Sequence, residues 1–441
     1  MGKGIALGLL AAISILLMAS FVYAQDAMSQ KQADSAAVAQ QMQTTIATAD
    51  TAAADTVYPI TPERRAMLNK YSDFKIGWEV FYEILQWIIL LAILYWGFSA
   101  KILKLSEKIT QNRFGQFVFF ILLFSLLTAV ISFPFDYYRD FIVEHQYGFS
   151  NQTFGAWLGD QLKMFGVSYI ASLIILGFLY WLLRKFPKRW WLYFAIGFVP
   201  FMVLTIIIVP VFISPLFNKF EPLKDQELKT EILSLASKAG IEGADVFQVD
   251  ASRQSNKLNA YVTGLWGTKR IVLYDTIIKA MTRPELDYVM AHEMGHYVKN
   301  HVWIFVGIMS VTMFIVLWLI SIIVPVLIRK YHNRWGFDNI SSYASLPLLF
   351  LVMSLIMFLV QPLNNGIART FEHAADKYGM EMTGYNGEAA AVAFEKLSAY
   401  NLSNPEPGKF VEFWFYDHPA LSKRIEFVKE YGKLHRNSPK S

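Results

Sequence analysis

Two histidines four residues apart, with a glutamate directly after the first, carry the clearest chemistry in the sequence. They are His292, Glu293 and His296. On a helix, residues four apart share one face, so both imidazoles can bind one metal ion, and the His-Glu-x-x-His pattern is typical of zinc proteases. Glu293 would lie about 100° further round that helix, where it can act as general base on a zinc-bound water. The pattern predicts one zinc ion per chain and a hydrolytic enzyme.

The third ligand must come from elsewhere. His301 follows His296 too closely to serve, but Glu372 and Asp376 are four residues apart in a later helical stretch. Such a pair alone is more often a solvated helical face. Beside an incomplete zinc site, we expect Glu372 to bind the metal and Asp376 to accept the free ring N–H of a ligating histidine. His373 should point elsewhere and not bind the metal.

This ligand set predicts a mechanism. Two histidines and one carboxylate leave a position for water, whose proton Glu293 would pass to the leaving amine. The tetrahedral oxyanion then needs a donor, and His418 and Arg424 are the candidate catalytic residues for that role. Taken alone, each would more often be an ordinary surface residue.

The helix that carries the zinc motif has a recognisable start. Thr282 can cap it, Pro284 falls in its first turn, and Glu285 completes a capping box. Upstream, residues 227–239 predict a helix.

A strand is predicted over 245–249, and Asn259–Val262 with 270–274 predict a hairpin. An edge strand of that hairpin could hold an extended substrate along Asn259, Ala260 and Tyr261 by backbone pairing. An ordinary hairpin fits the sequence as well.

Composition places the chain among integral membrane proteins. Of its 441 residues 54% are apolar, and several apolar runs are long enough to span a bilayer. The absence of cysteine excludes disulfides and Cys-ligated metal. A net charge of only +5, with no basic stripe carrying interleaved aromatics, argues against a nucleic-acid partner.

Six apolar segments organise the chain. They cover about 78–98, 114–134, 165–183, 190–213, 302–327 and 344–361. Pro200 and Pro210 should distort the fourth. We expect a signal peptide or first transmembrane helix over 1–24, with cleavage favoured, a low-complexity tether over 25–74, four spans over 75–213, a catalytic region over 214–301, two spans over 302–361, and a second catalytic region over 362–441 that carries the third ligand.

Both ligand-bearing segments adjoin spans. His296 is seven residues before Trp303, so a continuous helix would place the metal about 10 Å from apolar sequence. Glu372 lies eleven residues after Gln361. Such a site suits a lipid bilayer setting and peptide or membrane-protein substrates, possibly lipidated.

Together these residues resemble the integral-membrane zinc endopeptidases typified by the type I CAAX prenyl protease. The resemblance covers roughly residues 75–430 and rests on Tyr147-Gly148-Phe149 with Gln152-Thr153, Ile213 to Phe220, Asn259 to Tyr261 with 270–273, the zinc motif, Glu372 with Asp376, and His418-Pro419 with Arg424.

The resemblance implies that His292, His296 and Glu372 bind zinc, that Glu293 is the base, that Asn259 to Tyr261 lies along the substrate, and that His418 and Arg424 sit near the scissile bond. It also implies seven membrane helices in a ring, a zincin-like α+β catalytic part, and removal of a C-terminal tripeptide from prenylated proteins. This chain shows six clear spans, so a seventh could only be residues 5–23.

Loop charges predict the orientation. Three loops are rich in Lys and Arg, namely 99–113, 184–189 and 328–343, whereas loop 135–164 has only Arg139 and Lys163. The positive-inside rule places the three basic loops in the cytoplasm of a bacterium and the zinc site on the outer side of the inner membrane. The eukaryotic family members work on the cytosolic face, which stays the alternative.

Two further interpretations remain open. The same chemistry could serve quality control of unprenylated membrane or envelope proteins. The chain could also be a non-catalytic membrane scaffold with a metal site, but a metal-binding role alone does not require Glu293.

Overall fold

A computed structural model describes residues 61–264 and 269–436 of the chain. It is mainly helical, and within the described residues six helical stretches are long and apolar enough to cross a membrane. The predicted signal peptide over 1–24 and the first part of the predicted tether lie outside the described residues. The six stretches contain α2 (Pro62–Tyr95), α4 (Arg113–Asp136), α6 (Phe154–Lys185), α7 (Trp190–Ile208), α11 (His301–Trp335) and α12 (Leu346–Met382).

Two proline-bearing spans depart from regular helix. The α4 stretch contains Pro134 and continues as a π-helical turn, Tyr137–Val143, and then α5 (Glu144–Gln146). In the fourth span α7 ends at Ile208, and a π-helical turn with Pro210 near its start follows. Because proline has no N–H, it cannot continue the α-helical ladder at that point. Pro200 lies inside α7.

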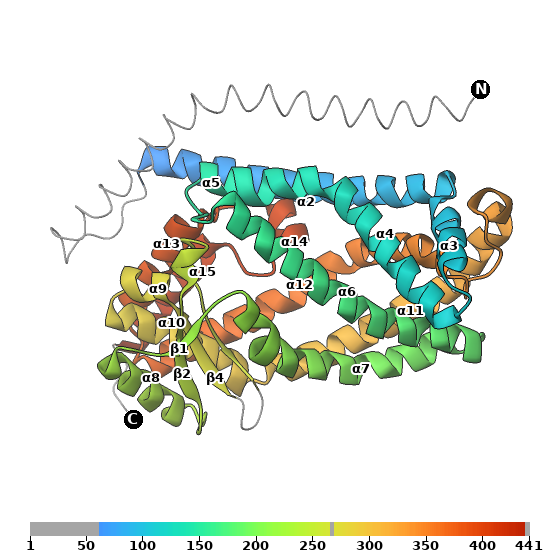
Figure 1. The fold of residues 1–441 in the computed structure, drawn as a ribbon. Coiled ribbons are helices and arrows are strands. Elements are labelled where there is room, and N and C mark those ends of the chain that lie inside the picture. Colours follow the sequence, from blue (N-terminus) through green and yellow to red (C-terminus); the bar gives the residue numbers. More distant parts are fainter. Residues whose placement is uncertain (1–60, 265–268, 437–441) are drawn as a thin grey trace, which may run out of the picture.

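A small mixed sheet and short helices lie at one end of the long helices (Figure 1). The strand order is β1 (Phe220–Pro222), β2 (Asp245–Val249), β4 (Arg270–Tyr274) and β3 (Ala260–Thr263). Ala260 pairs with Leu273 and Thr263 with Arg270, which confirms the predicted hairpin and makes β3 an edge strand. The helices at this end are α8 (Gln226–Lys238), α9 (Asp275–Ala280), α10 (Arg283–Val298), α13 (Gly387–Asn401), α14 (Lys409–Phe415) and α15 (Leu421–Arg436).

The predicted tether over 25–74 is wrong for residues 62–74, which form the first turns of α2. The hydroxyl of Thr61 accepts a hydrogen bond from the Arg64 amide, and Pro62 occupies the first helical turn, where its missing N–H costs nothing. Leu68 and Tyr71 are buried in a cluster with Phe149. Packing in this cluster, rather than insertion into the membrane, therefore stabilises the first turns of α2, which precede its membrane span.

The expected continuous helix from the zinc motif into the fifth span is also wrong. α10 ends at Val298, and Asn300 adopts a left-handed conformation (φ 57°) before α11 begins at His301. Asparagine tolerates this conformation better than most residues, so the chain can change direction here. By contrast, α12 runs without a break from the membrane span through Glu372, so the expected extension of the sixth span is confirmed.

The three basic loops gather at the other end of the molecule. They comprise α3 (Phe98–Ile109), the connection between α6 and α7, and the connection between α11 and α12. In Figure 1 these segments lie at the end opposite the sheet and α8. The molecule therefore has a cationic end and an end that holds the candidate site.

Candidate metal centre

The predicted metal site lies where α10 crosses α12. Two glycines bring the helices together: a Cβ on Gly295 would lie 3.2 Å from the Cα of Ala375, and one on Gly379 would lie 3.3 Å from the backbone N of His292. Both distances are tighter than ordinary van der Waals contact. Glycine at these positions lets the backbones approach closely enough for side chains of both helices to share one ion.

The N-terminus of α10 forms as expected. Thr282 and Glu285 form a capping box, with Pro284 in the first turn. Leu286 and Met290 bury one face of the helix in the core beside the sheet. This packing fixes the rotation of α10 and turns its histidines toward α12.

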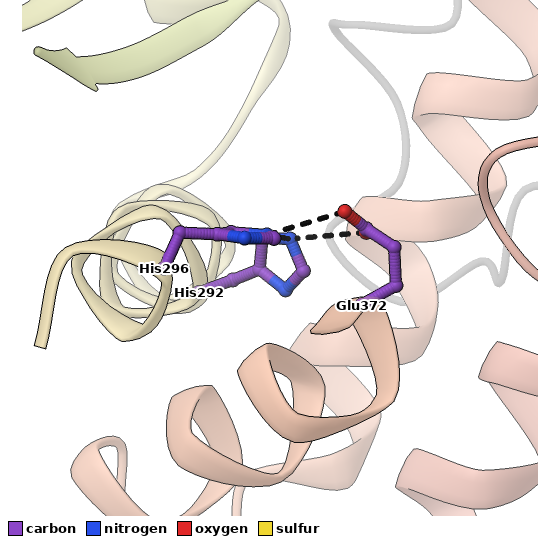
Figure 2. A group of neighbouring side chains, drawn as sticks. All are labelled: His292, His296 and Glu372. Carbon is purple, nitrogen blue, oxygen red and sulfur yellow. Dashed lines mark hydrogen bonds and ion pairs between the residues drawn. The ribbon is translucent and has the colours of Figure 1, made fainter. Parts of the chain in front are cut away.

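His292, His296 and Glu372 point toward one another (Figure 2). The Nε2 atoms of the two histidines are 3.2 Å apart, and they lie 3.4 Å and 3.2 Å from the two carboxylate oxygens of Glu372. Ligands about 2.0–2.2 Å from a tetrahedral zinc ion would be separated by roughly 3.3–3.6 Å. The spacing of these three groups therefore fits zinc.

A buried oxygen supports the same conclusion. Oε2 of Glu372 is buried and accepts no hydrogen bond from the described residues, although His292 and Arg424 approach within 3.4 Å. A buried carboxylate oxygen without a donor is costly unless a cation satisfies it. Two imidazoles and one carboxylate are a common donor set for a catalytic zinc.

Asp376 holds the far side of His292. Its Oδ1 lies 2.9 Å from His292 Nδ1, and its two oxygens accept hydrogen bonds of 2.6 Å and 2.9 Å from Arg424. The hydroxyl of Tyr288 adds a donor at 3.3 Å. An acceptor at Nδ1 leaves Nε2 of His292 free to face a metal. Asp376 therefore lies where it can accept a hydrogen bond from Nδ1 of His292.

Arg424 lies behind the ligands rather than on an open face. Its side chain is buried, it is held by Asp376, and its Nη2 is 3.3 Å from Glu372 and 3.5 Å from His292 Nδ1. The guanidinium also lies over the ring of Phe394 at 4.3 Å. This geometry favours a positioning role over direct contact with substrate.

His301 is a neighbour that the sequence interpretation set aside. It does not belong to the metal group, but its Nδ1 is 3.0 Å from Nδ1 of His296. Its ring is buried and stacks on Phe371, with centroids 4.5 Å apart and planes within 11°. In the sequence, only the position of His301 in the first turn of the next helix indicates this contact. The change of direction at Asn300 brings that first turn of α11 back against the zinc motif.

His418 and Glu293 stand close to the metal group. Nε2 of His418 is 3.3 Å from Oε1 of Glu372, and its Nδ1 is 2.7 Å from a carboxylate oxygen of Asp417. Partial removal from water lowers the pKa of the half-exposed His418, but Asp417 and the charge of Glu372 outweigh this effect and raise the pKa overall. Burial raises the pKa of Glu293, which lies near the same histidines.

The loop that presents His418 is fixed from two sides. The side chain of Arg369 on α12 donates to the carbonyl oxygens of Glu412 and Tyr416 at 3.0 Å and 2.6 Å. The carboxylate of Glu412 accepts from the Ala420 amide at 3.0 Å and from Lys423 at 2.6 Å. Burial alone would raise the pKa of Glu412, but these donors hold it below its usual value.

The predicted substrate residues lie on the free edge of the sheet. Ala260 and Tyr261 begin β3, whose only strand neighbour among the described residues is β4. Asn259 is exposed and uses its carbonyl oxygen to accept from Tyr274. β3 packs beside α10, so this edge adjoins the helix that carries the motif. His373 instead places its ring 4.4 Å from that of Phe427, and it is not part of the metal group.

Comparisons with known proteins agree with this architecture. The chain matches Peptidase family M48 over residues 222–432, and the profile described as CAAX prenyl protease N-terminal, five membrane helices, over 41–219. It is 36% identical to the uncharacterized metalloprotease YhfN of Bacillus subtilis, with 86% of this chain and 88% of that protein covered.

Two further comparisons concern yeasts. The chain is 30% identical to CAAX prenyl protease 1 of Saccharomyces cerevisiae over 83% of this chain and 86% of that protein. The crystal structure of S. mikatae Ste24p matches with a TM-score of 0.74 at 29% identity, covering 84% and 90% of the two chains. The similarity therefore extends over both the spans and the motif-bearing end.

Proposed function

We propose a function from one premise: this chain belongs to peptidase family M48 and is thus a multi-pass membrane zinc metalloendopeptidase. It cuts peptide bonds of membrane-associated polypeptides in the manner of a CAAX prenyl protease. The observation that carries the proposal is the group formed by His292, His296 and Glu372, whose nearest nitrogen and oxygen atoms are 3.2–3.4 Å apart. One of its members stands on a helix that continues into a membrane span.

The three residues would hold one zinc ion through two Nε2 atoms and the carboxylate. When bound, zinc supplies a Lewis acid and an acidified water. Glu293, which follows His292 on α10, would accept a proton from the attacking water and return it to the leaving amine. Burial raises the pKa of Glu293 above that of a free glutamate, which makes the carboxylate a stronger base.

His418 donates a hydrogen bond to the developing oxyanion. Nε2 of His418 lies 3.3 Å from Oε1 of Glu372, the oxygen that His296 also faces. The side chain of His418 is half exposed. The carboxylates of Asp417 and Glu372 raise the pKa of His418 and so favour the doubly protonated imidazolium, whose Nε2–H can donate. Arg424 acts through Asp376, which it holds against His292.

His301 keeps His296 in the tautomer that can bind zinc. A ligating imidazole has its second nitrogen protonated, and that N–H needs an acceptor. Nδ1 of neutral His301 supplies the acceptor at 3.0 Å, and stacking on Phe371 fixes the ring plane. His292 and His296 are thus each held from behind, one by a carboxylate and one by an imidazole.

The substrate lies extended along β3 and crosses the site near His418. The free edge of β3 offers backbone donors and acceptors at alternate residues, as strand addition requires. Asn259, Ala260 and Tyr261 are the residues of this chain that we assign to the contact. The name of the yeast relative suggests a prenylated C-terminus as one substrate class.

A second candidate function, quality control of unprenylated envelope proteins, is favoured by one observation. The three basic loops lie at the end opposite the site (Figure 1). With those loops in the cytoplasm, as the positive-inside rule expects, the site faces outward from a bacterial inner membrane. A cytosolic prenylated protein would then be out of reach.

A comparison of kcat between the Glu293→Gln variant and the wild type tests the mechanism. We expect a loss of 10²–10⁴-fold in kcat with zinc content unchanged, because the base is lost and the ligands are not. Glu381→Gln, an exposed substitution on α12, is the matched control. Undiminished cleavage by the Glu293 variant would sink the assigned base.

Two more measurements separate the substrate classes. Paired peptides of one sequence, with and without a prenylated cysteine, report whether the lipid is required. Alkaline phosphatase and a fluorescent protein, fused in turn after Ser441, report the side of the C-terminus. Phosphatase activity with equal cleavage of both peptides supports envelope quality control, whereas fluorescence with cleavage of the prenylated peptide alone supports the CAAX-type substrate.

A further inference from the structure

The cationic end of the molecule contains a cavity of about 470 Å³ between the start of α4 and the end of α6. It is lined by aromatic residues, one glycine and three cations: Arg113, Phe114, Phe117, Gly177, Tyr180, Trp181, Arg184, Lys185 and Tyr343. No acidic residue is among these lining residues. We propose that this cavity binds the headgroup of one anionic phospholipid.

The buried side chains at the base of the cavity already have their packing and hydrogen-bond partners. Phe117, Tyr180 and Tyr343 are buried, and the rings of Tyr180 and Tyr343 meet edge to face at 4.9 Å. Arg184 donates to the Tyr343 hydroxyl at 2.8 Å and lies over that ring at 4.3 Å. The guanidinium of Arg184 is therefore fixed in place before any ligand arrives.

The other two cations have no partner of their own. Arg113 is the first residue of α4 and Lys185 the last residue of α6. Both are exposed, and neither forms a side-chain hydrogen bond or ion pair within residues 61–264 and 269–436. Two unpaired cations beside a third that is already oriented form a complementary site for a phosphodiester.

The position of the cavity selects a lipid over a soluble anion. α4 and α6 both belong to membrane spans, so their ends mark the level of the headgroups. Phe114 is 71% exposed and Trp181 53% exposed at the mouth, where water would be a poor neighbour for both. An acyl chain that runs along these two residues would cover them, and an inorganic anion would not.

Native mass spectrometry of the detergent-purified full-length protein tests the proposal. The probes are phosphatidylglycerol, phosphatidylcholine with the same acyl chains, and inorganic phosphate. We expect one retained phosphatidylglycerol at concentrations where phosphatidylcholine does not bind. The readout is independent of protease activity, so it stands apart from the proposed function.

Arg113→Gln/Lys185→Gln should weaken retention about 30-fold, because each cation near the membrane surface contributes about a factor of five. Lys104→Gln/Lys108→Gln on α3 removes the same charge from the same end outside the cavity and should change retention less than twofold. Equal losses in both double variants would overturn the proposal. So would equal binding of the two lipids, or displacement of phosphatidylglycerol by an equal concentration of inorganic phosphate.

Discussion

Replacing Asp376 with Asn should weaken zinc binding and the fold by two separable routes. The carboxylate faces His292 Nδ1 at 2.9 Å and Arg424 at 2.6 Å and 2.9 Å. Oδ1 accepts from both neighbours and Oδ2 accepts from Nε of Arg424. An amide is uncharged and must turn its NH2 group toward a donor of either Arg424 or His292. Loss of the acceptor behind a ligating histidine typically costs 10–100-fold in metal affinity, or about 1.4–2.8 kcal/mol.

The second route is electrostatic. The side chains of Arg424 and Asp376 are only 8% and 2% exposed, so the substitution removes the nearer of the two carboxylates that face the buried guanidinium and leaves Glu372 at 3.3 Å. Breaking a buried pair in this way costs about 3–5 kcal/mol of stability. Asp376→Asn/Arg424→Met removes both charges and should recover most of the stability while zinc affinity stays low.

Competition with a chromophoric chelator gives zinc affinity, and thermal unfolding in detergent gives stability, each with Glu381→Gln as the control on the same helix. Zinc affinity within twofold of the wild type in Asp376→Asn would refute the assigned role. A double variant as unstable as the single one would refute the charge argument.

Three further predictions concern the surroundings of the site. His301→Ala should lower zinc affinity by about 10-fold or more, measured by the same competition, because His296 loses the acceptor of its N–H; His301→Asn, which restores an acceptor oxygen, should recover part of it. Gly379→Ala should cost about 1–3 kcal/mol in unfolding free energy and also weaken zinc binding, since its methyl group would press on the backbone of His292 at 3.3 Å; an unchanged melting temperature would contradict this. The pKa of Glu412 is lower in the folded protein than in the unfolded chain, so its ionised carboxylate stabilises the fold above the unfolded pKa, and this effect is lost as pH falls through the folded pKa. The Glu412→Gln variant should therefore lose less stability than the wild type on acidification between about pH 5 and 3. Parallel melting curves across that range would exclude this linkage.

The local sequence was sufficient for the parts of the site that depend on helical or strand periodicity. The spacing of His292 and His296 requires only a helix, and the spacing of Glu372 and Asp376 requires another. The same holds for the pairing of β3 with β4, since strand-forming residues flank Gly264 and Gly267 in the sequence. The structure joins these pieces as the chemistry of the donor set requires.

The parts that were missed depend on contacts between distant segments. α2 begins at Pro62 because its first turns pack near Phe149, which no local pattern of the polar leader region reveals. The break at Asn300 depends on where α11 packs, and that break brings His301 to His296. Arg424 was assigned to the substrate side, whereas its burial beside Asp376 follows from how α15 packs on α12.

The closeness of α10 and α12 has a consequence for how the protein comes apart. Two of the proposed zinc ligands are on α10 and the third is on α12, so an ion bound by all three would cross-link the two helices where they cross. A ligand that binds only the assembled form adds its binding free energy to that form. Loss of the ion would therefore release first the junction between the membrane-spanning helix α12 and the motif-bearing end. The supply of zinc would then govern the lifetime of the folded protein as well as its turnover.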